Sequence, residues 1–225
     1  MINTSSKLFH KTINNCPTPC SPTKTFDNTA TWNSTYLTAI ENITPEVLSI
    51  YDKIPNILPH QNCSDETKKE LEDIKNKQKN ITPKQQQQIN DELTLTYIYS
   101  LFQLNNCEKK EMNKLMTNYL MPIIMKLKKK HNRVRPYDLD PCIEPTAPKP
   151  LHAAYPSGHS SQAHFIAAVL SKKYPSKTTW YDSLANRVAT NREVAGVHYG
   201  SDSYYGKIAG ETIAKYVNLD NFLNC

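Results

Sequence analysis

The sequence predicts an all-α protein with a single helical domain. Apolar residues recur at steps of three or four along several segments, and no segment alternates apolar and polar residues convincingly enough for a strand. The length of 225 residues suits one domain of roughly 150–200 residues with some irregular polypeptide around it. A hydrophobic fraction of 38% is enough to bury a core, so the chain is expected to fold.

Residues 1–43 are expected to form an irregular N-terminal arm, and residues 44–225 the helical domain. The arm is rich in Asn, Thr, Ser and Pro and carries few apolar side chains, so no independent core is expected there. Phe26, Trp32 and Tyr36 are the candidates for docking it onto the domain.

Four helices are predicted in the first part of the domain. Thr44-Pro45-Glu46 supplies an N-cap, a proline and an acidic first turn, which open a short helix that ends near Pro55. Ser64 opens a second, highly charged helix. A third helix starts at Thr82-Pro83, and a fourth starts at about Glu108 and kinks at Pro122. The apolar stripe of the third helix consists of Ile89, Leu93, Tyr97, Leu101 and Leu104.

A proline-rich connection precedes the last helices. Six prolines lie between Pro136 and Pro156, inclusive, so this span is expected to be a loop and not a helix. Helical patterns then resume over three segments, which are His159 to Lys173, Thr178 to Val194 and Tyr199 to Val217.

Composition excludes several classes of protein. All five glycines lie at Gly158 or later, and no glycine-rich phosphate or dinucleotide loop exists. The net charge of +6 fits an anionic ligand but is too small to demand nucleic acid. No apolar run is long enough to span a bilayer, so a soluble protein is expected. No signal peptide is visible, and the compartment and homo-oligomerisation stay open.

The cysteines do not predict a metal site. Only Cys16 and Cys20 of the six form a close pair, and no second ligand module accompanies them, so disulfides or free thiols are favoured over zinc.

A basic run extends from Lys126 to Arg135. It fits either a solvated helix end or an anion site, and Lys129, Lys130 and Arg133 are expected to be solvated. His152 and His164 are interpreted as packing or surface residues rather than ligands.

Three groups of residues carry complementary chemistry. They are Lys128 with Arg135-Pro136, then Pro156-Ser157-Gly158-His159, then Arg192 with His198 and Asp202. The three cations suit phosphate oxygens, and Ser157 and Gly158 precede a helix whose N-terminus favours an anion. Asp202 lies four residues after His198, so the carboxylate can orient the imidazole. The two histidines are candidates for nucleophile and general acid.

These residues resemble the signature K-x6-R-P, P-S-G-H, S-R-x5-H-x3-D of the type-2 phosphatidic acid phosphatase family. That family shares its helical fold with class A acid phosphatases and vanadium-dependent haloperoxidases. The signature lies between Lys128 and Asp202, and the resemblance covers about Glu108 to Val217. One position departs, because Asn191 stands where the family has serine. Its amide can still donate to an oxyanion, so an altered but active site is expected.

The resemblance implies a role for each residue. His198, oriented by Asp202, would attack phosphorus, and His159 would protonate the leaving group. The phosphoryl oxygens would be held by Lys128, Arg135, Ser157, Gly158 and Arg192. The phosphatase would need no metal or other cofactor, whereas the haloperoxidase alternative would bind vanadate.

The expected function is that of a soluble, metal-independent acid phosphatase acting on phosphate monoesters through a phosphohistidine, with a phosphorylated small molecule as substrate. The alternatives are a vanadate-dependent haloperoxidase, a soluble lipid phosphate or diphosphate phosphatase and, least favoured, a non-enzymatic polyanion binder. No nucleic-acid partner and no membrane span are expected.

Overall fold

The computed structural model describes residues 21–41 and 43–225. Their secondary structure is helical apart from an isolated bridge between Thr25 and Arg133, so the all-α prediction is confirmed. Within these ranges no helix combines the length and the apolar character that a membrane span requires. The first 20 residues of the predicted arm, with Cys16 and Cys20, lie outside the described residues.

The first half of the chain holds short helices. They are η1 (Phe26–Asn28), α1 (Ser34–Glu41), α2 (Pro45–Tyr51), α3 (Asp65–Lys79), α4 (Pro83–Asp91), α5 (Leu95–Leu101) and α6 (Asn106–Leu115). The second half contains η2 (Met116–Leu120), α7 (Met121–His131), α8 (Pro136–Leu139), α9 (Gly158–Lys173), η3 (Pro175–Lys177), α10 (Thr178–Val194), α11 (Gly200–Tyr216) and α12 (Asp220–Leu223).

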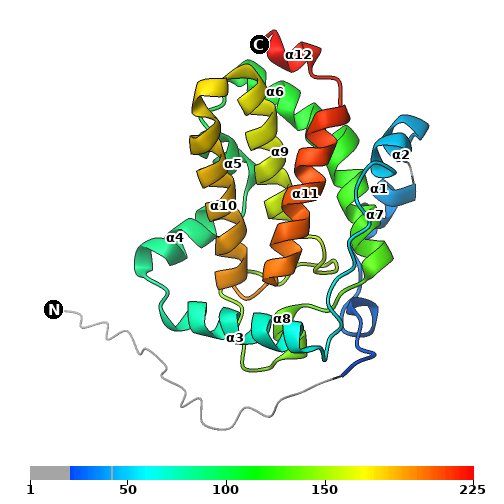
Figure 1. Ribbon diagram of the computed structural model, residues 1–225, viewed down its shortest axis with the longest axis vertical. Coiled ribbons are helices and arrows are strands. Elements are labelled where there is room, and N and C mark those ends of the chain that lie inside the picture. Colours follow the sequence, from blue (N-terminus) through cyan, green and yellow to red (C-terminus); the bar gives the residue numbers. More distant parts are fainter. Residues whose placement is uncertain (1–20, 42) are drawn as a thin grey trace, which may run out of the picture.

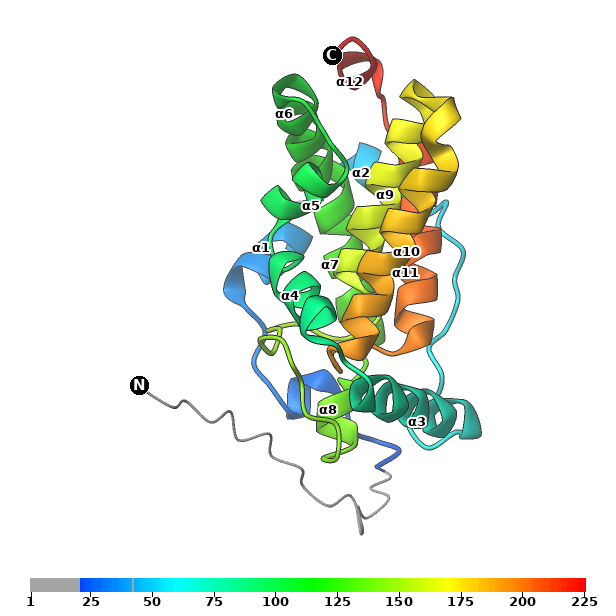
Figure 2. The same cartoon turned by 90° about the vertical axis from the view of Figure 1, so that its left-hand side faces the viewer.

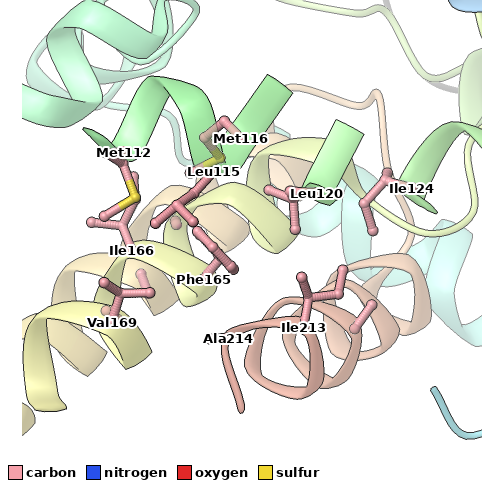
Figure 3. Packing of buried hydrophobic residues seen from close by; sticks show 14 of the residues in the cluster. Met112, Leu115, Met116, Leu120, Ile124, Phe165, Ile166, Val169, Ile213 and Ala214 are labelled. Carbon is pink, nitrogen blue, oxygen red and sulfur yellow. The ribbon is translucent and has the colours of Figure 1, made fainter. Parts of the chain in front are cut away.

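The long helices α9, α10 and α11 form the centre of the molecule. They lie side by side in Figures 1 and 2, with α9 packed against both of the others. Segments α6, η2 and α7 cover this layer, and in Figure 3 Met112 and Leu120 face Phe165 of α9 and Ile213 of α11. These four side chains are fully buried, so the core lies between the two layers.

Several predicted helices are confirmed. Thr44 and Ser64 cap α2 and α3 through their side chains, and α10 has the predicted bounds. The helix expected from Thr82 is two helices, because the Thr94 hydroxyl accepts a hydrogen bond from the Tyr97 amide and caps α5. Leu93, predicted to face the core, is consequently exposed.

Two other local predictions need correction. The proline-rich connection contains a short helix, α8, which begins at Pro136. The helix expected from about Glu108 is interrupted before Pro122 by a π-helical turn, η2, which lies between α6 and α7.

The described part of the arm is partly helical. Phe26 and Trp32 are buried with Ala153, and Tyr36 packs edge-on against His152. Helix α1 was not predicted from the sequence. The division into arm and domain remains a prediction.

A disulfide lies at the end of the bundle opposite to α3 and α8 (Figure 1). This disulfide joins Cys107 at the start of α6 to Cys225 at the end of the described chain. Cys63 and Cys142 are also disulfide-bonded, so no cysteine of the described residues is free.

Candidate active site

The three sequence motifs meet at one end of the helical bundle. Figure 1 shows α9 beginning, α10 ending and α11 beginning at the end where α3 and α8 lie. Gly196, with φ of 74°, makes the turn between α10 and α11. A Cβ at this position would lie 2.8 Å from side-chain atoms of Gln78 and Ile143, so glycine suits both the conformation and the space.

His198 and Asp202 form a buried pair at the start of α11. His198 Nδ1 lies 3.0 Å from Asp202 Oδ2, which also accepts the Tyr199 amide at 3.0 Å. Because an ionised carboxylate only accepts hydrogen bonds, Nδ1 carries the imidazole proton and Nε2 carries a lone pair. Burial, followed by the charges of Arg135 and Lys128, lowers the pKa of His198 well below its ordinary value, so the ring is neutral near pH 7.

Arg135 lies directly beside this histidine. Its Nη1 donates to His198 Nε2 at 3.0 Å and to the Val197 carbonyl at 2.6 Å. The remaining N–H groups donate to the carbonyls of His152 and Ala153. Burial lowers the pKa of Arg135 to about 10, although Tyr137, Asp202 and Asp138 act in the opposite direction.

Lys128 is fully buried at the end of α7. Its ammonium donates to the carbonyls of Ala153, at 2.8 Å, and Ala154, at 3.0 Å, and also to that of Pro156. Burial, followed by the charge of Arg135, lowers its pKa well below the ordinary lysine value. Backbone carbonyls therefore occupy the three donors of this ammonium group.

Ser157 and Gly158 lie at the N-terminus of α9, as predicted. The Ser157 amide donates to the Asp202 carbonyl at 2.9 Å, and its hydroxyl oxygen accepts from the Ser160 amide at 3.4 Å. The Ser157 amide thus ties α9 to α11. The Gly158 amide lies at the first helical position, where the helix supplies no acceptor. A Cβ on Gly158 would come 3.9 Å from Lys128 Cε, so the two residues adjoin.

Arg192 contacts Ile89 of α4 and Glu92, the residue that follows this helix. Its Nη2 donates to the Ile89 carbonyl at 2.7 Å and lies 3.8 Å from Glu92 Oε2. No described residue accepts a hydrogen bond from its buried Nε–H. Burial lowers the pKa of Arg192 to about 10.

Asn191 has a partner that the sequence did not predict. Its side-chain amide donates to Glu92 Oε2 at 2.9 Å. Glu92 is fully buried and also binds Arg187 at 3.1 Å. Asn191 therefore anchors Glu92 beside Arg192 and supports the site indirectly.

His159 is half-buried and, with Gly158, is the least enclosed of the predicted site residues. It makes a hydrogen bond with the backbone of Leu93. Burial and then the Arg192 charge lower the pKa of His159 to about 3. A substrate approaching from the surface would therefore meet His159 and Gly158 first.

Arg133, expected to be solvated, is buried. Its Nη1 donates to Asp202 Oδ1 at 2.7 Å, and its Nη2 lies 3.0 Å from Glu70. The basic run is not one helix end, because Asn132 terminates α7 in the left-handed region with φ of 47° and Arg133 lies beyond the helix. Lys129 and Lys130 are exposed, as predicted.

The two other histidines differ from each other. His164 is buried and packs as expected, with Nδ1 2.8 Å from the Ser160 carbonyl. His152 is half-buried, and its Nδ1 lies 3.0 Å from Arg135 Nη2. It therefore contacts the site as a neighbour of Arg135.

The site carries an excess of positive charge. The carboxylate of Asp202 is paired with Arg133, and Glu92 is shared among Arg187, Asn191 and Arg192. Among the described residues, neither Lys128 nor Arg135 forms an ion pair with a carboxylate, and the Arg192 Nε–H has no hydrogen-bond partner. This donor set fits a tetrahedral or trigonal-bipyramidal oxyanion such as phosphate or vanadate. The described residues contain no cluster of side chains suited to a metal cation.

Comparison with known proteins finds a family match in the part of the chain that contains the three motifs. Residues 113–223 match the model of the PAP2 superfamily. No curated protein matches the chain.

Two solved structures share the fold. A bacterial vanadium-dependent iodoperoxidase aligns with a TM-score of 0.53 and 15% identity over 72% of this chain and 50% of its own. A transmembrane PAP2-type phosphatidylglycerolphosphate phosphatase from Bacillus subtilis aligns with a TM-score of 0.50 and 16% identity, over 81% of this chain and 94% of its own. The chain thus spans half the length of the iodoperoxidase. Residues 113–223, which contain all three motifs, are thus a PAP2 superfamily region.

Proposed function

We propose that the protein is a soluble, metal-independent acid phosphatase that hydrolyses phosphate monoesters through a phosphohistidine on His198. The observation that carries this proposal is the hydrogen bond of 3.0 Å between His198 Nδ1 and Asp202 Oδ2. It fixes the tautomer in which Nε2 has a lone pair, within a group of cations that attracts phosphate.

In the first step, Nε2 of His198 attacks phosphorus and the bond from phosphorus to the leaving oxygen breaks. His159 gives its proton to that oxygen. In the second step, His159 takes a proton from water, the water oxygen attacks phosphorus, and the phosphorus–nitrogen bond breaks. His198 is again neutral, and inorganic phosphate is released.

The cations stabilise the negative charge that the phosphoryl oxygens carry in the transition state. The Nε–H of Arg192 and the Gly158 amide are the donors best placed to bind an oxyanion without first leaving a partner. Lys128 and Arg135 contribute charge, and an oxyanion would replace some of their carbonyl partners.

A bound phosphate group would also prepare the general acid. Burial and the cations hold the pKa of His159 at about 3 in the free protein. Negative charge from the substrate opposes the effect of Arg192, so binding raises this pKa and favours the protonated imidazole. An acidic, bell-shaped pH profile follows, because His159 must be protonated while His198 is neutral.

The same donors would hold vanadate, which would supply peroxide activation for halide oxidation in the haloperoxidase alternative. The structural similarity to the iodoperoxidase is a likeness of fold, so this function stays second. Lipid phosphates remain alternative substrates, and a polyanion binder would use the cations without the histidines.

The test is hydrolysis of an aryl phosphate from pH 4 to 9 by the purified protein in detergent-free buffer with a chelator. We expect turnover that disappears in His198→Ala and persists in the control His164→Ala, together with a phosphohistidine trapped on His198. Turnover that survives in His198→Ala would contradict the proposal. Halide oxidation with vanadate, hydrolysis of lipid phosphates alone, or phosphate binding without turnover would each favour the corresponding alternative.

A further inference from the structure

Asp202 uses its two carboxylate oxygens for different partners. Oδ2 accepts from His198 Nδ1 and from the Tyr199 amide, both at 3.0 Å. Oδ1 accepts from Nη1 of Arg133 at 2.7 Å. The side chains of Asp202 and Arg133 are almost completely buried. The carboxylate is therefore held from both sides, and the imidazole is only one of its partners.

Arg133 is itself fixed by several contacts. Its Nη1 donates to Ser201 Oγ at 2.7 Å, and its Nη2 lies 3.0 Å from Glu70 Oε2 on α3. Its guanidinium carbon lies 3.8 Å from the centroid of the Tyr199 ring, a stacking distance. The other oxygen of Glu70 accepts from the Ser201 amide at 2.6 Å. Helix α3 thus reaches the histidine through Glu70, Arg133 and Asp202.

We propose that Arg133 is a positioning residue, which holds the Asp202 carboxylate in the orientation that presents His198 Nε2 and offsets part of the carboxylate charge. The expected effect of Arg133 on the reaction rate rests on the proposed function. Its effect on the tautomer and the pKa of the His198 imidazole can be measured whether or not the protein is a phosphatase. A planar guanidinium suits the role because it can bind both carboxylates and stack on Tyr199 at once.

Removal of Arg133 should change the pKa of His198 in a predictable direction. The Asp202 carboxylate would keep its full charge beside His198 and would stabilise the protonated imidazole, so the pKa of His198 would rise. The charged or titratable groups around this histidine are Glu70 (α3), Lys128 (α7), Arg133 and Arg135 (between α7 and α8), His152 (between α8 and α9), His159 (α9), Arg192 (α10), and Tyr199 and Asp202 at the start of α11. Of these, Arg133 is the cation bound to the carboxylate itself.

The experiment compares Arg133→Met with Arg133→Lys and with the control Lys173→Met. Lys173 pairs with the buried Glu108 at 2.9 Å, at the opposite end of α9 from the motifs. The control therefore breaks an ion pair with a buried carboxylate away from the site. Thermal stability, kcat/KM against pH and the ¹⁵N chemical shifts of the His198 ring are measured for each full-length variant.

For Arg133→Met we expect kcat/KM to fall by about 10–100-fold. The acidic limb of kcat/KM should move up by about one pH unit, and the His198 ¹⁵N shifts should show a higher pKa and a mixture of tautomers. Arg133→Lys should keep the pH limb near that of the native protein, because it keeps the charge, but should not recover full kcat. Lys173→Met should lose stability without moving the pH limb or the His198 shifts.

A structural role alone would make Arg133→Met behave like Lys173→Met, and that result would overturn the inference. If Arg133→Met does not fold, the same measurements are made on Arg133→Gln, which keeps a hydrogen-bond donor for Asp202 but removes the charge. The pH limb and the His198 pKa should again move upwards. A native protein without turnover would overturn the phosphatase proposal, whereas the ¹⁵N shifts would still test the positioning of His198. Unchanged shifts in Arg133→Met and Arg133→Gln would overturn the positioning role even in an active enzyme.

Discussion

The two ends of the helical bundle differ in whether their surroundings stabilise buried charged side chains. At the disulfide end, where Cys107 and Cys225 are joined, Glu108 is buried but fully matched. Burial alone would raise the pKa of Glu108, but hydrogen bonds from the Asn105 backbone, Lys173 and Tyr174 lower it, so the charge is stabilised. At this end of the bundle, the buried carboxylate is therefore stabilised by its hydrogen-bonding partners.

At the motif end, where Lys128, Arg135 and Arg192 meet, the environment disfavours the charges. Burial lowers the pKa of each of these three cations. Arg192 lies 3.8 Å from Glu92, whereas Lys128 and Arg135 form no ion pair with a carboxylate of the described residues. A buried cation without a matching anion costs stability, and a bound oxyanion would recover it. The disulfide end therefore gains stability from its buried charges, whereas the motif end would gain stability from its cations only with a bound anion.

The largest expected effect comes from Arg192→Met. Turnover of an aryl phosphate should fall by about 10²–10³-fold, because a donor to the transition-state oxyanion is lost. Unfolding stability should fall far less than activity, since Arg192 loses one hydrogen bond, to Ile89, while Glu92, 3.8 Å away, keeps Arg187 and Asn191 as partners. Kinetics and urea unfolding check both parts, and a loss of stability as large as the loss of activity would remove the contrast between the two ends.

Removal of the disulfide should give the reverse pattern. The double variant Cys107→Ser, Cys225→Ser should lose about 2–4 kcal/mol of unfolding stability, because the bridge constrains a sequence separation of 118 residues in the unfolded chain. kcat at 25 °C should be unchanged for the folded protein. Calorimetry and steady-state kinetics test this, and a fall in kcat with native stability would contradict it.

Two glycines of α11 offer a finer comparison along one helix contact. A Cβ at Gly206 would come within 2.7 Å of the Ser157 carbonyl oxygen, so Gly206→Ala should displace the start of α9. We expect a loss of about 1–3 kcal/mol of stability, together with reduced kcat. Gly210→Ala, whose Cβ would meet Ser161 and Phe165 one turn further on, should lose stability with less effect on kcat. Equal effects on kcat would show that the start of α9 is not sensitive to this contact.

The smallest effect should be a pH-dependent stabilisation by phosphate. The pKa of His159 is about 3 when folded and 6.5 in its unperturbed form, so the unfolded chain binds more protons between these values. Stability of the free protein should therefore fall as the pH decreases from about 6.5 towards 3. Inorganic phosphate should reduce this fall by raising the pKa of His159. Thermal unfolding from pH 4 to 7, with and without phosphate, checks it, and His159→Gln should weaken the dependence.

Local sequence signals predicted most of the helices because their causes are local. Thr44 and Ser64 cap the helices that they were expected to cap, and the pattern from Thr178 to Val194 predicted α10. The helix from Thr82 was misjudged because Thr94 is both a tolerable helix residue and a good N-cap. Only packing against neighbouring helices chooses between these two states.

The site illustrates the same division. The order and spacing of the three motifs identified Lys128, Arg135, Ser157, Gly158, His159, Arg192, His198 and Asp202 as candidate residues, and the structure brings them to one end of the bundle. Their catalytic roles remain predictions. The spacing of four residues between His198 and Asp202 was informative, although His198 precedes α11 and the two do not share a helical turn. Asp202 lies in the first turn of α11, and its carboxylate reaches back to His198 Nδ1.

What the sequence determined by itself was therefore the helical class, the motif residues and the pairing of His198 with Asp202, all of which depend on residues close in sequence or on a family signature. Tertiary structure alone decided that Arg133 is buried against Asp202 and Glu70, that Glu92 captures the Asn191 amide, and that Ser157 donates to Asp202. These contacts join residues between 45 and 99 positions apart, for which helical periodicity gives no signal. Burial then converts them into strong interactions, because water no longer competes for the charges.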